Sequence, residues 1–173
     1  MSAPESSVPE FSHRWDLRQI NDRPVPLEAT AAERKALARR FGVVAIERLT
    51  ATLTLLREGE VVHARGRLEA AVMQSCAVSG EDLATVIDEP LALRFVPEAL
   101  VDVEELELRT DELDEIAYAG HALDLGEAVA QSLALAIDPY ATGPQAERVR
   151  REAGLHDEAA SGPFAALAAL KKS

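Results

Sequence analysis

The chain of 173 residues is poor in cysteine, in aromatic residues and in positive charge. A single cysteine, Cys76, excludes an internal disulfide and a cysteine-rich metal site. With one Trp, two Tyr and four Phe, the chain offers few platforms on which single-stranded bases could stack. The formal net charge of −12 excludes binding to nucleic acid by overall attraction, so phosphate contacts need a local basic patch.

Long apolar runs are also missing. No run reaches the roughly 18 residues expected of a membrane span. The first residues have neither the basic start nor the apolar core of a signal peptide. We therefore expect a cytoplasmic protein with no membrane partner. The length fits one domain with tails, and the 47% of hydrophobic residues is enough for a substantial core without disulfides.

The longest predicted element is a hairpin between Val61 and Val96. Apolar and polar residues alternate along residues 62–72 and again along residues 83–96. Such alternation places one apolar and one solvated face on a strand. Between the two runs, Ser79 and Gly80 are typical of a turn, because glycine accepts a positive φ and serine bonds local backbone. Cys76 is therefore expected near the hairpin tip.

The remaining pattern predicts further strands and two capped helices. Thr30 and Glu33 form a capping-box signature, and Gly42 ends that helix. A second helix is expected to begin at Asp124 and to cover the apolar face of the sheet. Strands are expected at 11–20, 25–27, 44–56 and 116–118. The predicted class is α+β: a curled antiparallel sheet of about five strands, a meander or open barrel-like sheet, packed by two or three helices.

The predicted organisation has four parts. They are a flexible N-terminus (1–10), a single domain (11–140), a loose linker with a weak helix (141–162) and a short amphipathic helix (163–172). The domain is expected to carry an acidic loop at 98–115, which contains nine acidic residues and one basic residue, Arg109. This loop is either a solubilising segment or an acidic decoy for a basic partner such as a ribosomal protein. Its adjacent carboxylates Glu104 and Glu105 do not form a catalytic pair, because no apolar pocket separates their pKa values.

The first predicted helix carries the densest basic cluster of the chain. Its members are Arg34, Lys35, Arg39 and Arg40. One interpretation is a solvated face whose cations lie towards the helix C-terminus, where the helix dipole favours them. The alternative is a set of phosphate contacts, and we keep these four residues as candidates for that role.

The last predicted helix is too short to be stable alone in water, so it must dock on something. Pro163 suits its first position, and its apolar and basic residues fall at helical spacing. It either docks on the protein's own core or binds a partner by lying in a groove. The candidate partner-binding residues are Pro163, Phe164, Leu167, Leu170, Lys171 and Lys172.

These features together resemble the YceD family of bacteria and plastids. The resemblance covers roughly residues 40–172: a strand ending in Cys76, a turn, a second long strand, an acidic stretch, and a helix opening with Asp124-Leu125. Its most specific part is the closing Pro163-Phe164-Ala165-x-Leu167-x-x-Leu170-Lys171. The resemblance implies a role in accumulation of the large-subunit ribosomal RNA. We therefore expect a non-enzymatic accessory factor of large-subunit biogenesis whose partners are ribosomal proteins or assembly intermediates, with RNA contact mainly indirect.

One departure from the family concerns metal binding. Many members carry Cys-x-x-Cys at the hairpin tip, whereas this chain reads Cys76-Ala77-Val78-Ser79. Serine is a poor zinc ligand, so we predict no metal and no other cofactor. Two rival functions remain: direct RNA binding through the basic patches, and an enzyme with Cys76 at its site. The enzyme would require a thiol pKa lowered by a nearby cation.

Overall fold

The computed structural model describes residues 9–101 and 114–154. The chain divides into two compact units, each described here by itself. The first comprises Met1–Met73 and Ala84–Asp138, and the second comprises Gln74–Leu83 and Pro139–Ser173. The predicted boundaries at 11–140 and 141–162 remain predictions.

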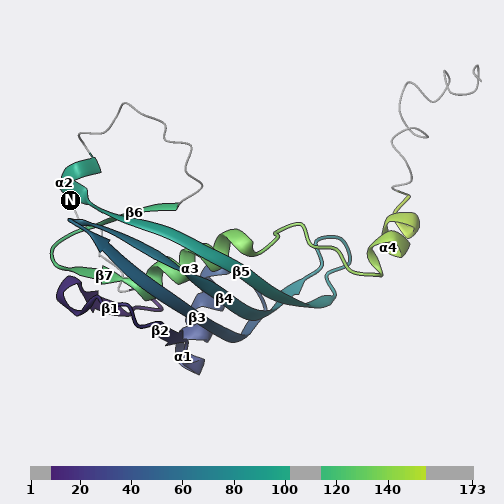
Figure 1. The fold of residues 1–173 in the computed structure, drawn as a ribbon. Coiled ribbons are helices and arrows are strands. Elements are labelled where there is room, and N and C mark those ends of the chain that lie inside the picture. Colours follow the sequence, from purple (N-terminus) through teal and green to yellow (C-terminus); the bar gives the residue numbers. More distant parts are fainter. Residues whose placement is uncertain (1–8, 102–113, 155–173) are drawn as a thin grey trace, which may run out of the picture. The chain divides into compact units, whose positions relative to one another are not determined.

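The main sheet has five strands in the order β2-β3-β4-β5-β6, as Figure 1 shows. They are β2 (Val25–Glu28), β3 (Ala45–Glu58), β4 (Val61–Ser75), β5 (Asp82–Pro97) and β6 (Asp114–Tyr118). Two short strands, β1 (Arg14–Asp16) and β7 (Ala122–Asp124), form a separate antiparallel pair. The α+β class and the count of five strands in the main sheet are confirmed. The order has two open ends among the described residues, so barrel-like closure is not confirmed.

Two strand predictions need correction. The last strand, β6, pairs with β5 in parallel, with Phe95 opposite Ile116, so the sheet is not a simple antiparallel meander. The chain must cross over between the two strands, and alternation alone does not reveal that direction. The strand predicted at 11–20 is too long. Within that range only Arg14–Asp16 forms a strand, and a 3₁₀ helix, η1 (Leu17–Gln19), follows where the Asp16 side chain accepts a hydrogen bond from the Arg18 N–H.

Four α-helices are present in the described part of the chain. They are α1 (Ala31–Phe41), α2 (Glu98–Val101), α3 (Leu125–Ala136) and α4 (Ala146–Glu152). Of these, α1 and α3 begin at their predicted capping residues. The predicted capping box of α1 is present in both directions between Thr30 and Glu33, and Gly42 ends the helix at a φ of +67°. Such a φ favours glycine because a Cβ would strain the backbone. Of the acidic stretch 98–115, the first residues form α2 and the last two belong to β6; its middle lies outside the described residues.

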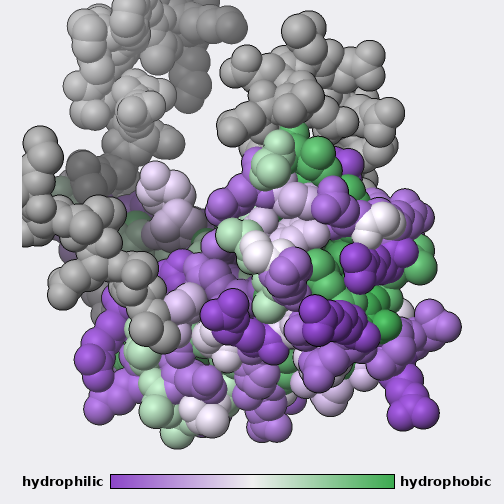
Figure 2. Space-filling view, turned by 90° about the vertical axis from the view of Figure 1, so that its left-hand side faces the viewer, coloured by the Kyte–Doolittle hydropathy of each residue, from purple (hydrophilic) through white to green (hydrophobic). Residues whose placement is uncertain are grey.

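The core of the first unit lies between the sheet and the helices α1 and α3, which share one side of the sheet in Figure 1. Buried and more exposed positions alternate along most of β3, β4 and β5, as the sequence predicts, but Phe95 and Val96 at the end of β5 are both buried. The largest fully buried side chains are Phe11, Leu37, Leu49, Leu53, Leu55, Val62, Leu68, Leu93, Phe95, Leu123, Leu125 and Leu133. Burial of such a set is the main favourable term for folding. Figure 2 shows a largely hydrophilic outer face, with hydrophobic residues gathered in a smaller area.

Candidate functional site

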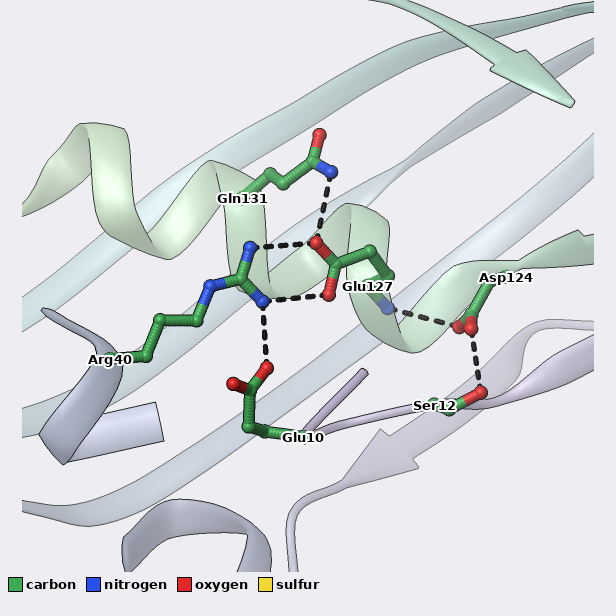
Figure 3. Close-up of polar contacts among 6 residues, drawn as sticks. All are labelled: Glu10, Ser12, Arg40, Asp124, Glu127 and Gln131. Atoms are coloured by element: carbon green, nitrogen blue, oxygen red, sulfur yellow. Dashed lines mark hydrogen bonds and ion pairs between the residues drawn. The ribbon is translucent and has the colours of Figure 1, made fainter. Parts of the chain in front are cut away.

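An ionic network joins three segments at the end of α1 (Figure 3). The Arg40 guanidinium donates to both carboxylate oxygens of Glu127 on α3, at 2.9 and 2.8 Å, and to Glu10 at 3.0 Å. Gln131 donates to Glu127 from the next turn of α3, at 3.0 Å. A bidentate arginine–carboxylate pair fixes geometry as well as charge. This network therefore anchors residues 9–13 and α1 against α3.

Asp124 is the second anchor of the same region. Its carboxylate caps α3 by accepting from the Glu127 N–H, and it also accepts from the Ser12 hydroxyl at 2.6 Å and the His13 N–H at 3.0 Å. The N-terminal segment passes so close to α3 that a Cβ on Gly126 would lie 2.7 Å from backbone atoms of Phe11 and His13. Hydrogen-bond donors thus engage both Asp124 and Glu127, and these bonds fix the N-terminal segment and α1 against α3.

The Glu127 carboxylate should make stability depend on pH. Its hydrogen bonds from Arg40 lower its pKa, against the opposing effect of burial. A lowered folded-state pKa adds stability above the unfolded value, about 4.3, and that stability is lost as pH falls through the folded pKa. We expect Glu127→Gln to reduce the free energy of unfolding by about 1 kcal/mol at pH 7, the upper range for a partly exposed pair. In urea titrations, the difference in free energy of unfolding between wild type and Glu127→Gln should become smaller below pH 4.

Glu47→Gln is the matched control for this prediction, because it removes one charge from an exposed carboxylate on β3 for which no ion pair is found among the described residues. It should leave stability nearly unchanged at both pH values. An equal loss in the two variants would show that net charge, and not the Arg40–Glu127 pair, determines the effect.

The four cations of the predicted phosphate-contacting cluster have different surroundings. Arg40 is held by Glu10 and Glu127, which raise its pKa, and its guanidinium carbon lies 5.7 Å from the centre of the Phe41 ring. Arg34 is half-buried and donates to the Ala29 carbonyl at 2.6 Å. Lys35 and Arg39 are exposed, and no ion pair involves them among the described residues. Structural contacts thus already engage Arg34 and Arg40, and the phosphate-binding role of the cluster stays a prediction.

A groove of about 500 Å³ lies beside this network in the first unit. Its polar lining comes from Ser12, Arg14, Asp124, Glu127 and Gln131. Its apolar lining includes Phe95, Ile116, Tyr118, Ala119, Ala122 and Ala128. The lining residues come from three separate stretches of the chain: residues 9–14, Phe95 of β5 and residues 116–131. No local pattern in the sequence predicts such a groove, because its members are brought together only by the pairing of β1 with β7 and of β5 with β6.

Cys76 lies in the second unit, one residue beyond the end of β4, and is buried. Its sulfur accepts from the backbone N–H groups of Ser79 and Gly143, both at 3.3 Å. These contacts, with the Ser79 side chain contributing most, lower the thiol pKa to about 6. The lowering comes from hydrogen-bond donors rather than from a cation. The enzymatic alternative at Cys76 stays a prediction.

The hairpin tip and residues 139–154 are joined by backbone contacts within the second unit. The Ala77 N–H donates to the Ala141 carbonyl at 3.0 Å, and the Glu81 carboxylate accepts from the Gln145 N–H at 3.2 Å. The α4 helix follows directly, with Ala146 buried. The tip thus holds the start of this C-terminal segment.

The candidate partner-binding residues lie outside the described residues. They are Pro163, Phe164, Leu167, Leu170, Lys171 and Lys172. Within residues 9–101 and 114–154, no cluster of three or more His, Cys, Asp or Glu side chains could hold a metal ion. No helix in those ranges is both long and apolar enough to cross a membrane.

Comparison with known proteins adds a family match. A family model described as "Large ribosomal RNA subunit accumulation protein YceD" matches residues 64–171, more than half of the chain. No curated protein and no solved structure matches. The matched segment begins within β4 and includes residues 163–171 of the predicted closing helix. The basic cluster on α1 lies before it.

Proposed function

Because this chain belongs to the YceD family, we propose that it is a non-enzymatic accessory factor in large ribosomal subunit biogenesis. In this role it supports the synthesis, processing or stability of large-subunit ribosomal RNA. The family match is the observation that carries the proposal, since the family's description concerns accumulation of that RNA. The partners are ribosomal proteins or large-subunit assembly intermediates.

Charge supports action through protein contacts. The net charge of −12 opposes general attraction to RNA. Several cations are engaged by carboxylates: Arg40 by Glu127, Arg67 by Asp88 and Arg94 by Glu115. A cation whose charge is already offset by a neighbouring carboxylate attracts a phosphate less strongly. RNA contact is therefore mainly indirect, and direct RNA binding through small basic patches is the alternative.

The closing segment 163–172 is the leading candidate for the partner contact. It lies almost wholly within the matched segment, whereas Arg34, Lys35, Arg39 and Arg40 do not. An amphipathic helix of this length gains stability by laying its apolar face into a partner's groove. The apolar residues Phe164, Leu167 and Leu170 then supply the contact, and Lys171 and Lys172 flank it.

The test is capture of partners from cell lysate by the tagged full-length chain, with and without ribonuclease, analysed by mass spectrometry. We expect large-subunit proteins to remain bound after ribonuclease. The chain truncated after Gly162 should lose about 90% or more of this capture, as expected when a small set of apolar anchors carries most of an interface. Capture that disappears with ribonuclease would favour the direct RNA-binding alternative, which also predicts a steep loss of RNA affinity with salt.

Two substitution sets separate apolar from ionic contact. Changing Phe164, Leu167 and Leu170 to Ser should act like the truncation, whereas Lys35→Ala with Arg39→Ala should leave capture intact. The second set is exposed on α1 and outside the matched segment. If the truncated chain captures as well as the full chain, the assignment of the closing helix is wrong.

A further inference from the structure

The outer edge of β6 is open among the described residues. β6 forms the end of the main sheet and pairs only with β5 there. An edge strand presents unpaired N–H and C=O groups that can accept a further strand. The opposite edge strand, β2, contains Pro26, which has no N–H to donate. β6 contains no proline, so strand addition is more favourable at its edge.

The groove of about 500 Å³ lies directly beside this edge. Ile116, Ala117 and Tyr118 of β6 line it, and Phe95 of β5 and Ala128 of α3 contribute further apolar surface. In strand addition, main-chain hydrogen bonds supply affinity and pockets for alternate side chains supply specificity. The open edge of β6 offers the main-chain hydrogen bonds, and the adjacent groove offers a pocket for alternate side chains.

The charge around the groove favours a basic occupant. Asp124 and Glu127 line it, and β6 begins with the exposed residues Asp114 and Glu115. The cation in the lining is Arg14. Arg40 and Arg94 offset part of the negative charge through their pairs with Glu127 and Glu115. Carboxylates still outnumber cations around the groove. This local negative charge, like the net charge of −12 of the whole chain, attracts cationic partners.

We propose that the β6 edge and its groove bind an extended, Lys- or Arg-containing segment of a protein partner by strand addition. The segment pairs with the backbone of β6, and its inward side chains enter the groove. Its cations lie near the acidic rim, which consists of Asp114, Glu115, Asp124 and Glu127. That the partner belongs to the large subunit rests on the function proposed above. The binding mode itself rests on the edge, the groove and the charge.

The test uses the full-length chain and a labelled seven-residue peptide in which Lys alternates with Val and Thr. The same peptide with Glu in place of Lys is the control. We expect the Lys peptide to bind at least about tenfold more tightly, because its charge complements the rim. Hydrogen exchange should then slow at residues 114–119 and remain unchanged at residues 25–28.

A pair of substitutions tests the position. Ala119 is exposed and lines the groove, so Ala119→Trp should fill it and weaken binding of the Lys peptide by about tenfold or more. Ala84→Trp makes the same change at an exposed position of β5 that does not line the groove, and should bind as wild type. Equal weakening in both variants would overturn the proposal.

Three other outcomes would also overturn it. They are equal affinity for the two peptides, protection at residues 25–28 instead of 114–119, and concentration-dependent protection of 114–119 without peptide. The last would mean that a second copy of the chain occupies the edge. Failure of the proposed function is a separate result: peptide binding at β6 without ribosomal capture would retain the groove and reject the ribosomal partner.

Discussion

Replacing Gly66 by alanine is expected to destabilise the protein by about 3 kcal/mol or more, beyond the usual cost of an added methyl group in a core. Gly66 lies in β4 opposite Leu53 of β3. A Cβ at this position would lie 1.7 Å from the Thr52 carbonyl oxygen and 2.8 Å from its carbon. Both are backbone atoms of an interior strand, so no side-chain rotation relieves the contact. The two strands would have to separate locally.

The reverse substitution two residues earlier is the control. Ala64 is fully buried on the same strand, so Ala64→Gly should cost only about 1 kcal/mol, from backbone entropy and a lost methyl group. Urea denaturation of both variants and wild type measures the difference. A Gly66→Ala variant within 1 kcal/mol of wild type would mean that β3 and β4 can shift apart at little cost.

The sequence predicted those parts of the fold that depend on local signals. Alternation placed β3, β4 and β5, and the capping residues Thr30 and Asp124 placed the starts of α1 and α3. Each signal acts within a few residues, because alternation and capping satisfy backbone and side chains locally. The Gly80 turn followed for the same reason, with a φ of +72°. Such features need no knowledge of which strands become neighbours.

The parallel pairing of β6 and the short β1–β7 pair were not predictable in this way. Five residues of strand carry the same alternation whether the partner runs parallel or antiparallel. The β1–β7 pair joins Trp15 to Leu123 across most of the chain, so no tight turn connects the two strands directly and sets their register. The length of the strand predicted at 11–20 was wrong because Asp16 forms a local hydrogen bond with the Arg18 N–H, which favours the 3₁₀ turn.

In the candidate site, too, local features could be predicted from the sequence, whereas long-range contacts could not. The basic residues of α1 could be identified from composition, but the partners of Arg40 could not. Glu127 lies 87 residues away and Glu10 lies 30 residues away. The groove likewise depends on β6 lying beside β5 and on residues 9–14 lying along α3. Sequence reasoning therefore identifies candidate charges, whereas the fold determines which of them are already paired.

Truncation of Phe11 to alanine is the second large effect that we expect, at about 3 kcal/mol in the free energy of unfolding. Phe11 is fully buried and its ring meets that of His13 edge-on at 5.1 Å. Its removal leaves a cavity and frees the segment that supplies Ser12 and Arg14 to the groove. Hydrogen exchange at residues 9–16 should rise more than exchange in the main sheet.

Phe41→Ala is the matched control, because Phe41 is only partly buried against the same core. Phe41→Ala should reduce the free energy of unfolding clearly less than Phe11→Ala does, because a partly buried ring removes less apolar surface from water on folding. If the two variants are equally destabilised, the polar contacts of Ser12 and His13 with Asp124 hold the N-terminal segment more strongly than its packing does. In that case Asp124→Ala, and not Phe11→Ala, should be the substitution that releases residues 9–16 and opens the wall of the groove.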